Sequence, residues 1–165
     1  ISVIEDFNTL VDLDVDAYIP PEYIVNEVQK LDIYKRIAGI ENERECDDMR
    51  EELLDRFGRI PKSVGNLLRI ALIRSHAHRL YMPEVKGKNE RISFMLRPDA
   101  PIRVENIPLL ISDYGGRLRF DPKGDPTFYL HYRKCGVIEK DEETLLMLTG
   151  EALTKMEELL LAGAG

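Results

Sequence analysis

The sequence contains no tryptophan, only two cysteines and no long apolar run. Cys46 and Cys135 lie far apart and match neither a zinc-ligand spacing nor a disulfide framework, so we expect both to be reduced packing residues. The apolar runs at 145–148 and 159–162 are far too short to span a bilayer, and no signal peptide opens the chain. We therefore expect a cytoplasmic protein without a membrane partner.

Motifs of self-contained catalysis are also absent from the sequence. It has no glycine-rich loop that would cradle nucleotide phosphates, no Gly-x-Ser-x-Gly elbow and no His-Glu-x-x-His metal motif. His76 and His78 are two residues apart on a predicted helix and so diverge by about half a turn, while His131 is distant in sequence. We expect these 165 residues to have no enzymatic activity and to bind no cofactor or metal ion.

The composition is that of a folded domain, with 44% hydrophobic and 32% charged residues and a net charge of −7. The charge is segregated along the chain. Residues 22–58 carry eleven acids against six bases, whereas residues 59–103 carry ten bases against three acids. The acidic whole argues against a fragment that grips DNA on its own, but the basic middle keeps a nucleic-acid function open.

The chain begins with a predicted strand at 11–19, where apolar and polar residues alternate. Asp12, Asp14 and Asp16 fall on its polar side. A calcium loop starting at Asp12 needs glycine at its sixth position and glutamate at its twelfth, and both are missing. We expect these aspartates to form the solvent-facing side of the strand.

Helical spacing predicts three helices next, at about 24–41, 43–57 and 61–81. The first is marked by apolar residues at helical spacing: Ile24, Val28, Leu31, Tyr34 and Ala38. Further elements are predicted in the second half of the chain: a strand at 92–96, a short helix capped by Asn106, a hairpin of 118–120 with 127–132, and a long helix at 142–161 capped by Asp141. This order predicts an α+β fold, with three helices after a first strand and then an antiparallel sheet with one inserted short helix and a long C-terminal helix.

The second predicted helix carries the strongest local signal. Met49, Leu53 and Phe57 form its apolar stripe, Gly58 provides a left-handed stop, and Pro61 suits the first turn of the next helix. Four carboxylates are spaced three, four and three apart along the same helix: Glu45, Asp48, Glu52 and Asp55. Like charges at this spacing repel by about 0.2–0.5 kcal/mol per pair.

Asp55 is additionally disfavoured by the negative end of the helix dipole. The carboxylates therefore suggest a basic partner. The alternative is a solvated helix face on which Arg44 and Arg56 partly relieve the repulsion.

Three sequence segments are distinctive in combination: Ala-Tyr-Ile-Pro-Pro-Glu-Tyr-Ile at 17–24, Ile-Tyr-Lys-Arg-Ile-Ala at 33–38, and Asp-Arg-Phe-Gly at 55–58 with Pro61 downstream. In this order they resemble the C-terminal domain of the bacterial transcription-repair coupling factor (Mfd, TRCF), from about Val11 to about Leu161. Because the chain begins with isoleucine, we expect a piece of a longer protein. Residues 1–10 would be a linker or the end of a preceding motor module, and residues 11–165 a single C-terminal regulatory domain.

The resemblance implies an autoinhibitory function. In this family the C-terminal domain packs on the N-terminal UvrB-like module of the same polypeptide, masks the surface that recruits UvrA, and restrains the ATP-driven translocase that removes stalled RNA polymerase. ATP and magnesium would bind the helicase-like motor of the parent, which would also contact double-stranded DNA. The expected interface residues are Glu45, Asp48, Glu52 and Asp55.

An alternative function remains open from the residues themselves. The basic segment 59–103 could serve a DNA- or RNA-polymerase-binding accessory domain, with Lys62, Arg69 and Arg74 of the third predicted helix as contacts. Few aromatic residues interleave with these bases, which weakens a model of single-strand stacking on this helix.

Overall fold

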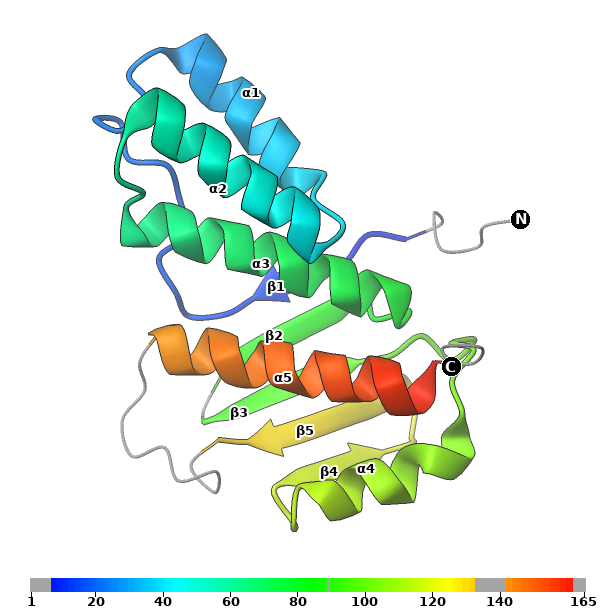
Figure 1. Cartoon of the computed structure of the whole chain (residues 1–165). Coiled ribbons are helices and arrows are strands. Elements are labelled where there is room, and N and C mark those ends of the chain that lie inside the picture. The colour runs from blue at the N-terminus through cyan, green and yellow to red at the C-terminus, as the bar shows by residue number, and fades with distance from the viewer. Residues whose placement is uncertain (1–6, 89, 133–141, 162–165) are drawn as a thin grey trace. The chain divides into compact units, whose positions relative to one another are not determined.

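The computed structural model describes residues 7–88, 90–132 and 142–161, and the chain divides into two compact units (Figure 1). The helical unit comprises residues 15–75, and the sheet unit comprises residues 1–14 with 76–165. Helix α3 (Lys62–Arg79) begins in the first and ends in the second. The expected domain limits, 1–10 and 11–165, stay a prediction.

The helical unit is built from α1 (Glu27–Ala38), α2 (Glu43–Phe57) and most of α3. Asparagine side chains cap the first two helices: Asn26 Oδ1 accepts from the backbone N–H of Gln29 and Asn42 Oδ1 from that of Glu45. The predicted bounds of α2 and α3 agree with the structure to within two residues. Helix α1 is shorter than predicted because its cap lies at Asn26.

The core of the helical unit lies between these helices and the chain that leads into α1. Met49 and Leu53 of the predicted apolar stripe of α2 belong to this core. Its buried residues are Ile19, Ile24, Ile33, Ile37, Ile40, Cys46, Met49, Leu53, Val64, Leu68 and Ala71. Phe57 is only partly buried at the edge of this core, with its ring centroid 5.8 Å from that of Tyr23. Gly58 ends α2 at φ +86°, a conformation that favours glycine.

The apolar residues that mark α1 in the sequence do not all pack into the core. Val28 and Leu31 are 77% and 59% exposed, and Ile33 and Ile37 pack into the core in their place. Both pairs have helical spacing, so periodicity identifies the helix but not its packed side.

The sheet unit contains a five-stranded sheet with the order β1-β2-β3-β5-β4. Its strands are β1 (Leu10–Asp12), β2 (Glu84–Lys88), β3 (Arg91–Met95), β4 (Leu118–Asp121) and β5 (Thr127–His131). All neighbours are antiparallel except β1, which joins the edge of the sheet parallel to β2. The predicted α+β class is confirmed, while the parallel pairing of β1 was not predicted.

The predicted strand at 11–19 is wrong beyond Asp12, where β1 ends. Alternation nevertheless continues in the exposure of the side chains. Leu13 and Ile19 are buried, whereas Asp14 and Asp16 are exposed. The period-two pattern therefore reports alternating burial in an irregular segment that follows β1.

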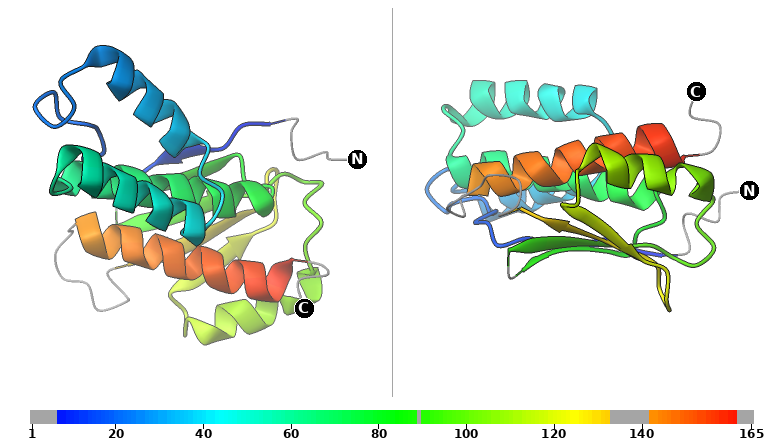
Figure 2. Two further views of the ribbon diagram at one scale, coloured as in Figure 1. Left: turned by 45° about the horizontal axis from the view of Figure 1, so that its top comes forward. Right: turned by 90° about the horizontal axis from the view of Figure 1, so that it is seen from below.

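Helices α4 (Ile107–Asp113) and α5 (Glu142–Leu160) lie on the same side of the sheet (Figure 2). Gly87 of β2 faces them at close range. A Cβ atom at this position would lie 2.9 Å from Leu13 Cδ2 and 3.5 Å from Leu145 Cδ1, so only glycine fits without displacing Leu13. The side of β2 that carries Gly87 is therefore the packed face of the sheet.

The predicted short helix is confirmed as α4, with Pro108 in its first turn, but the predicted cap is wrong. Asn106 makes no capping hydrogen bond, and its Nδ2 instead donates to the carbonyl oxygen of Leu159 at 2.6 Å. The predicted cap of α5, Asp141, lies outside the described residues. No helix in the described ranges is long and apolar enough to cross a bilayer.

Two adjacent leucines of α2 test this packing. Leu53 is fully buried and Leu54 is 56% exposed. We expect Leu53→Ala to lower the free energy of unfolding by about 2–5 kcal/mol, because it leaves a cavity in the core. Leu54→Ala should change it by about 0.5 kcal/mol or less, as is usual for surface positions. Urea unfolding followed by circular dichroism measures both, and equal losses would contradict the assigned packed side of α2.

Candidate functional site

The four carboxylates predicted from the sequence lie along one flank of α2, here called the acidic stripe: Glu45, Asp48, Glu52 and Asp55. The opposite flank is fixed in the core by Cys46, Met49 and Leu53. The stripe borders α1, because Glu52 contacts an arginine of that helix. Its members have different surroundings, so they are not equivalent.

Glu45 serves the start of its own helix. Its backbone N–H donates to Asn42 Oδ1 at 2.9 Å, and its Oε1 accepts from the backbone N–H of Glu41 at 3.2 Å. This reciprocal arrangement satisfies one backbone N–H before the helix and one within its first turn. The helix dipole also favours an acid in the first turn. Glu45 therefore has a structural role in α2.

Glu52 is paired inside the helical unit. Arg36 of α1 donates from both terminal nitrogens to its two carboxylate oxygens, each at 2.6 Å, and Arg56 donates to Oε2 at 2.7 Å. The hydrogen bonds from Arg36 and then Arg56 lower the pKa of Glu52 to about 2. The ion pair also raises the pKa of Arg36. Two arginines thus neutralise the middle of the stripe. Arg56 was among the residues that the sequence suggested for this role, whereas Arg36 of α1 was not.

Asp48 and Asp55 are the exposed members that remain. Neither forms an ion pair with another residue in the described part of the chain. Asp55 lies in the last turn of α2, where the helix dipole disfavours an acid. These two carboxylates are the part of the stripe whose charge the helical unit does not use.

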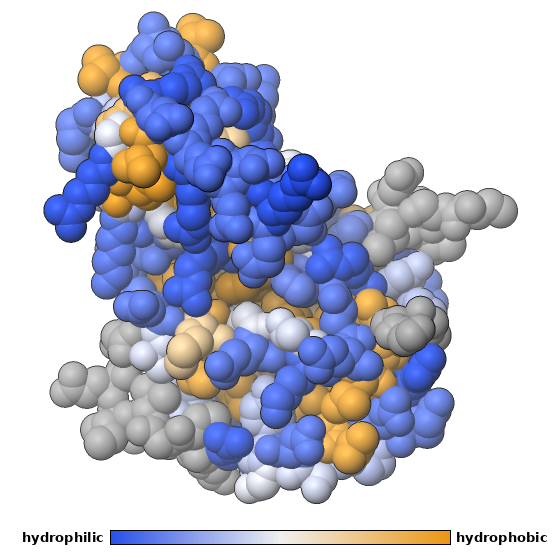
Figure 3. Space-filling model, in the orientation of Figure 1, coloured by the Kyte–Doolittle hydropathy of each residue, from blue (hydrophilic) through white to orange (hydrophobic). Residues whose placement is uncertain are grey.

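Exposed apolar side chains accompany the stripe on the same unit. Val25, Val28 and Leu31, at the start and on the outer side of α1, are 79%, 77% and 59% exposed. Figure 3 shows apolar surface on the helical unit surrounded by hydrophilic residues. Exposed apolar groups that gather on one element are typical of protein–protein contact. The sequence could have revealed them, since α1 carries two apolar stripes and only one can pack.

The predicted nucleic-acid contacts on α3 do not form one surface. Lys62 and Arg69 are seven residues apart and share a side, but Arg74 is turned away from them by about 140°. Arg74 donates to the carbonyl oxygen of Ala38 at 3.3 Å, and burial lowers its pKa. It therefore supports the end of α1, and nucleic-acid contact by Lys62 and Arg69 stays a prediction.

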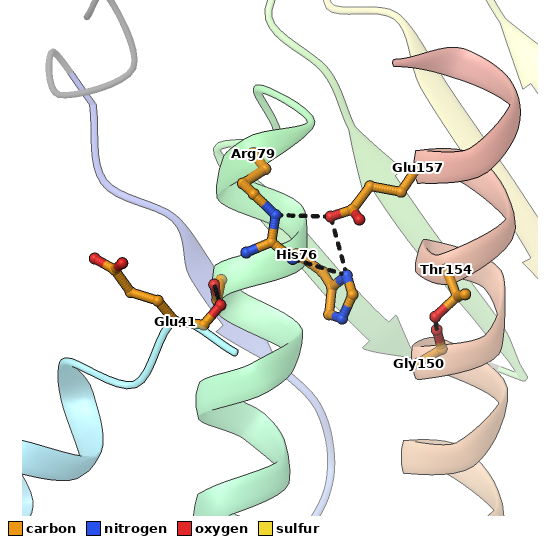
Figure 4. Close-up of polar contacts among 7 residues, drawn as sticks. Glu41, His76, Arg79, Gly150, Thr154 and Glu157 are labelled. Carbon is orange, nitrogen blue, oxygen red and sulfur yellow. Dashed lines mark hydrogen bonds and ion pairs between the residues drawn. The ribbon is translucent and has the colours of Figure 1, made fainter. Parts of the chain in front are cut away.

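The histidines of α3 have structural contacts within the sheet unit. His76 Nδ1 lies 3.1 Å from Glu157 Oε1, and the same oxygen accepts from Arg79 Nε at 2.8 Å (Figure 4). His78 stacks on Phe7 with ring centroids 4.5 Å apart. These contacts hold the last turn of α3 to α5 and to the segment before β1.

The cysteine prediction is confirmed where the structure describes it. Cys46 is buried in the core of the helical unit, and burial raises the pKa of its thiol. A raised thiol pKa disfavours the reactive thiolate, so Cys46 is a packing residue. Cys135 lies outside the described residues.

Comparison with known proteins places this geometry in a family. A family model described as the TRCF domain matches residues 13–107, which include the whole acidic stripe. The chain belongs to the TRCF domain family. The predicted family resemblance is thereby confirmed, and the match extends through all of α1, α2 and α3.

Individual relatives of this TRCF domain chain agree with the family match. It is 30% identical over 122 residues to the transcription-repair-coupling factor of Bacillus subtilis (strain 168), covering 73% of the chain and 10% of that protein. It is 40% identical over 90 residues to the factor of Staphylococcus epidermidis, covering 54% of the chain and 8% of that protein. The chain thus spans about a tenth of the length of these relatives.

A solved structure is similar over almost the entire TRCF domain chain. It is the crystal structure of the C-terminal domain of a transcription-repair coupling factor, with a TM-score of 0.73 and 28% sequence identity. The match covers 92% of this chain and 95% of that one. The α+β fold of this chain is therefore that of the solved domain.

The Glu52 ion pair gives a testable pH dependence. Because the folded pKa of Glu52 is near 2 and the unfolded value near 4.5, its stabilisation is present above about pH 4.5 and is lost as the pH falls through 2. We expect Glu52→Gln to be less stable than the parent chain at pH 6, by about 0.2–1 kcal/mol because the pair is partly exposed. The difference should shrink at pH 2. Urea midpoints of both chains at the two pH values measure this, and a difference independent of pH would contradict the pairing.

Proposed function

We propose that this chain is a C-terminal regulatory domain that holds a longer transcription-repair coupling factor in a closed state. The acidic stripe packs against basic residues of the N-terminal UvrB-like module of the same polypeptide. The observation that carries this proposal is the exposure of Asp48 and Asp55, two carboxylates that form no ion pair within the described part of the chain. The helix dipole also disfavours Asp55, which lies in the last turn of α2. A basic surface would compensate both charges.

The energetics favour a mixed contact. Exposed ion pairs contribute only about 0.2–1 kcal/mol each, so Asp48 and Asp55 alone would orient the partner more than bind it. Val28 and Leu31 can supply affinity, because fully burying such a side chain contributes about 1.5–3 kcal/mol. Exposed carboxylates and exposed apolar groups on one unit suit a protein partner better than a phosphate backbone.

The regulatory mechanism is a population shift. Contacts of the helical unit stabilise the closed state, and breaking them frees the surface that recruits UvrA and releases the translocase from restraint. In this proposal the motor of the parent binds ATP and magnesium, contacts double-stranded DNA and displaces stalled RNA polymerase. The residues of this chain perform no chemical step and act by binding alone.

Glu45 and Glu52 have a supporting role in this proposal. Glu52 keeps Arg36 and Arg56 beside the stripe, and Glu45 secures the start of α2. Reversing Glu52 to lysine would place three cations together and disturb the helical unit itself. A test of docking is therefore sharper at Asp48 and Asp55.

The test uses a full-length transcription-repair coupling factor that carries this domain. We expect the double variant Asp48→Lys/Asp55→Lys to raise UvrA affinity by about 2- to 30-fold, the equivalent of two exposed ion pairs. A matched control is Asp47→Lys/Glu51→Lys, which makes the same charge change at exposed positions of α2 outside the stripe. Binding is measured at equal salt for the parent, the double variant and the control.

The outcomes separate docking from general electrostatics. A higher UvrA affinity of the stripe variant, with no change in the control, supports the proposal. Thermal unfolding of each 165-residue variant verifies that the fold is intact. Equal effects of the stripe variant and the control would show a dependence on net charge only. Unchanged UvrA affinity with an intact fold would rule out the stripe as the docking surface.

A further inference from the structure

The sheet has one face that α4 and α5 do not cover (Figure 2). Residues directly opposite each other in a sheet point to the same side. Two rows of residues lie on the packed side. One row contains Gly87, Ile92, Leu130 and Leu118, and the other contains Val85, Phe94, Phe128 and Phe120. The alternate residues of these strands therefore point to the opposite side.

This opposite side carries bases around an aromatic ring. We call it the open sheet face and define it by six residues from four strands: Lys86, Arg91, Ser93, Arg119, Tyr129 and His131. Lys86, Ser93, Tyr129 and Arg119 lie opposite one another in a row that crosses the sheet. Arg91 and His131 form the next row. Arg91 and Arg119 are exposed, and Tyr129 is half-buried.

The acids of this side lie at its margins. Glu84 and Asp121 belong to the row on the other side of Tyr129, at β2 and β4, and Asp12 lies on the edge strand β1 opposite Lys86. The surroundings of Tyr129 are therefore basic, with Arg119 directly opposite it and the Arg91 guanidinium 4.5 Å from its ring centroid.

We propose that the open sheet face binds single-stranded nucleic acid. Tyr129, with the guanidinium of Arg91 against its ring, offers a planar stack on which an unpaired base can add. Lys86, Arg91 and Arg119 are spread over three strands and can contact successive phosphates. Bases stack on aromatic rings and on guanidinium planes without sequence preference, and cations follow the backbone.

Charge and shape together favour a single strand over a duplex. The bases of a duplex are already stacked on each other and cannot reach a ring on a sheet, whereas a single strand can place them flat against Tyr129. The exposed groups near Tyr129 are the guanidinium groups of Arg91 and Arg119, whose charge a chain of phosphates complements. The proposal is independent of docking through α2, since none of its residues belongs to the helical unit.

The test is fluorescence polarisation of the 165-residue chain with a labelled 15-nucleotide thymidine oligomer and a labelled 15-base-pair duplex. We expect the single strand to bind at least fivefold more tightly. With three phosphate contacts, the logarithm of its affinity should fall with the logarithm of salt concentration with a slope of about −2. Replacing Arg91 or Arg119 by glutamine should reduce the slope by about 0.7.

Variants of Tyr129 test the stacking. Tyr129→Leu, which keeps apolar bulk but removes the ring, should weaken single-strand binding about tenfold, and Tyr129→Phe should retain it. The matched control is Lys62→Gln/Arg69→Gln on α3, which removes two bases outside the face. Circular dichroism melts of each variant verify the fold.

Three results would overturn the proposal. They are no detectable binding of the single strand at low salt, equal or tighter binding of the duplex, and loss of binding in the α3 variant but not in the variants of the face. The last result would transfer any nucleic-acid contact to the helical unit.

Discussion

The burial of one edge of α2 is the constraint on which the helical unit depends. Cys46, Met49 and Leu53 are fixed in the core, so the acidic stripe has to remain on an exposed flank. The energies are unequal. Each buried side chain contributes about 1.5–3 kcal/mol, whereas each like-charge pair costs about 0.2–0.5 kcal/mol. The fold can therefore maintain an unfavourable row of carboxylates at small cost, and pairing of Glu52 with Arg36 and Arg56 lowers that cost further.

Local signals explain what could be predicted from the sequence. Helices α2 and α3 were predictable because the stop at Gly58 and the start near Pro61 depend on neighbouring residues only. The packed side of α1 was not, because the pair Val28 and Leu31 and the pair Ile33 and Ile37 both have helical spacing. Packing against the other helices decides between these stripes, and that choice involves residues far away in sequence.

The remaining errors have the same origin in long-range contacts. Arg36 lies sixteen residues before Glu52 in the sequence, and it pairs within the helical unit a carboxylate that the sequence assigned to a contact with another module. Strand β1 pairs with β2, which lies more than seventy residues later in the sequence. The side chain of Asn106 donates to the carbonyl oxygen of Leu159 and does not cap its own helix. The open sheet face joins Lys86 to Tyr129 through strand register. No local sequence pattern brings these residues together. Along α3 itself, few aromatic residues interleave with the bases.

The acidic and basic blocks of the sequence each contribute to a surface of different chemistry, the acidic stripe of α2 and the open sheet face. The acidic part of the sequence forms α2, beside exposed aliphatic side chains of α1, and aliphatic groups gain free energy when another protein excludes water from them. The basic part supplies Lys86 and Arg91 next to Tyr129, and an aromatic ring among cations suits stacked bases and phosphates. Salt should therefore affect the two surfaces unequally. Screening weakens phosphate contacts steeply, whereas a docking contact with aliphatic groups retains most of its affinity when its ion pairs are screened. A net charge of −7 for the whole chain conceals this division, because it averages over surfaces of different chemistry.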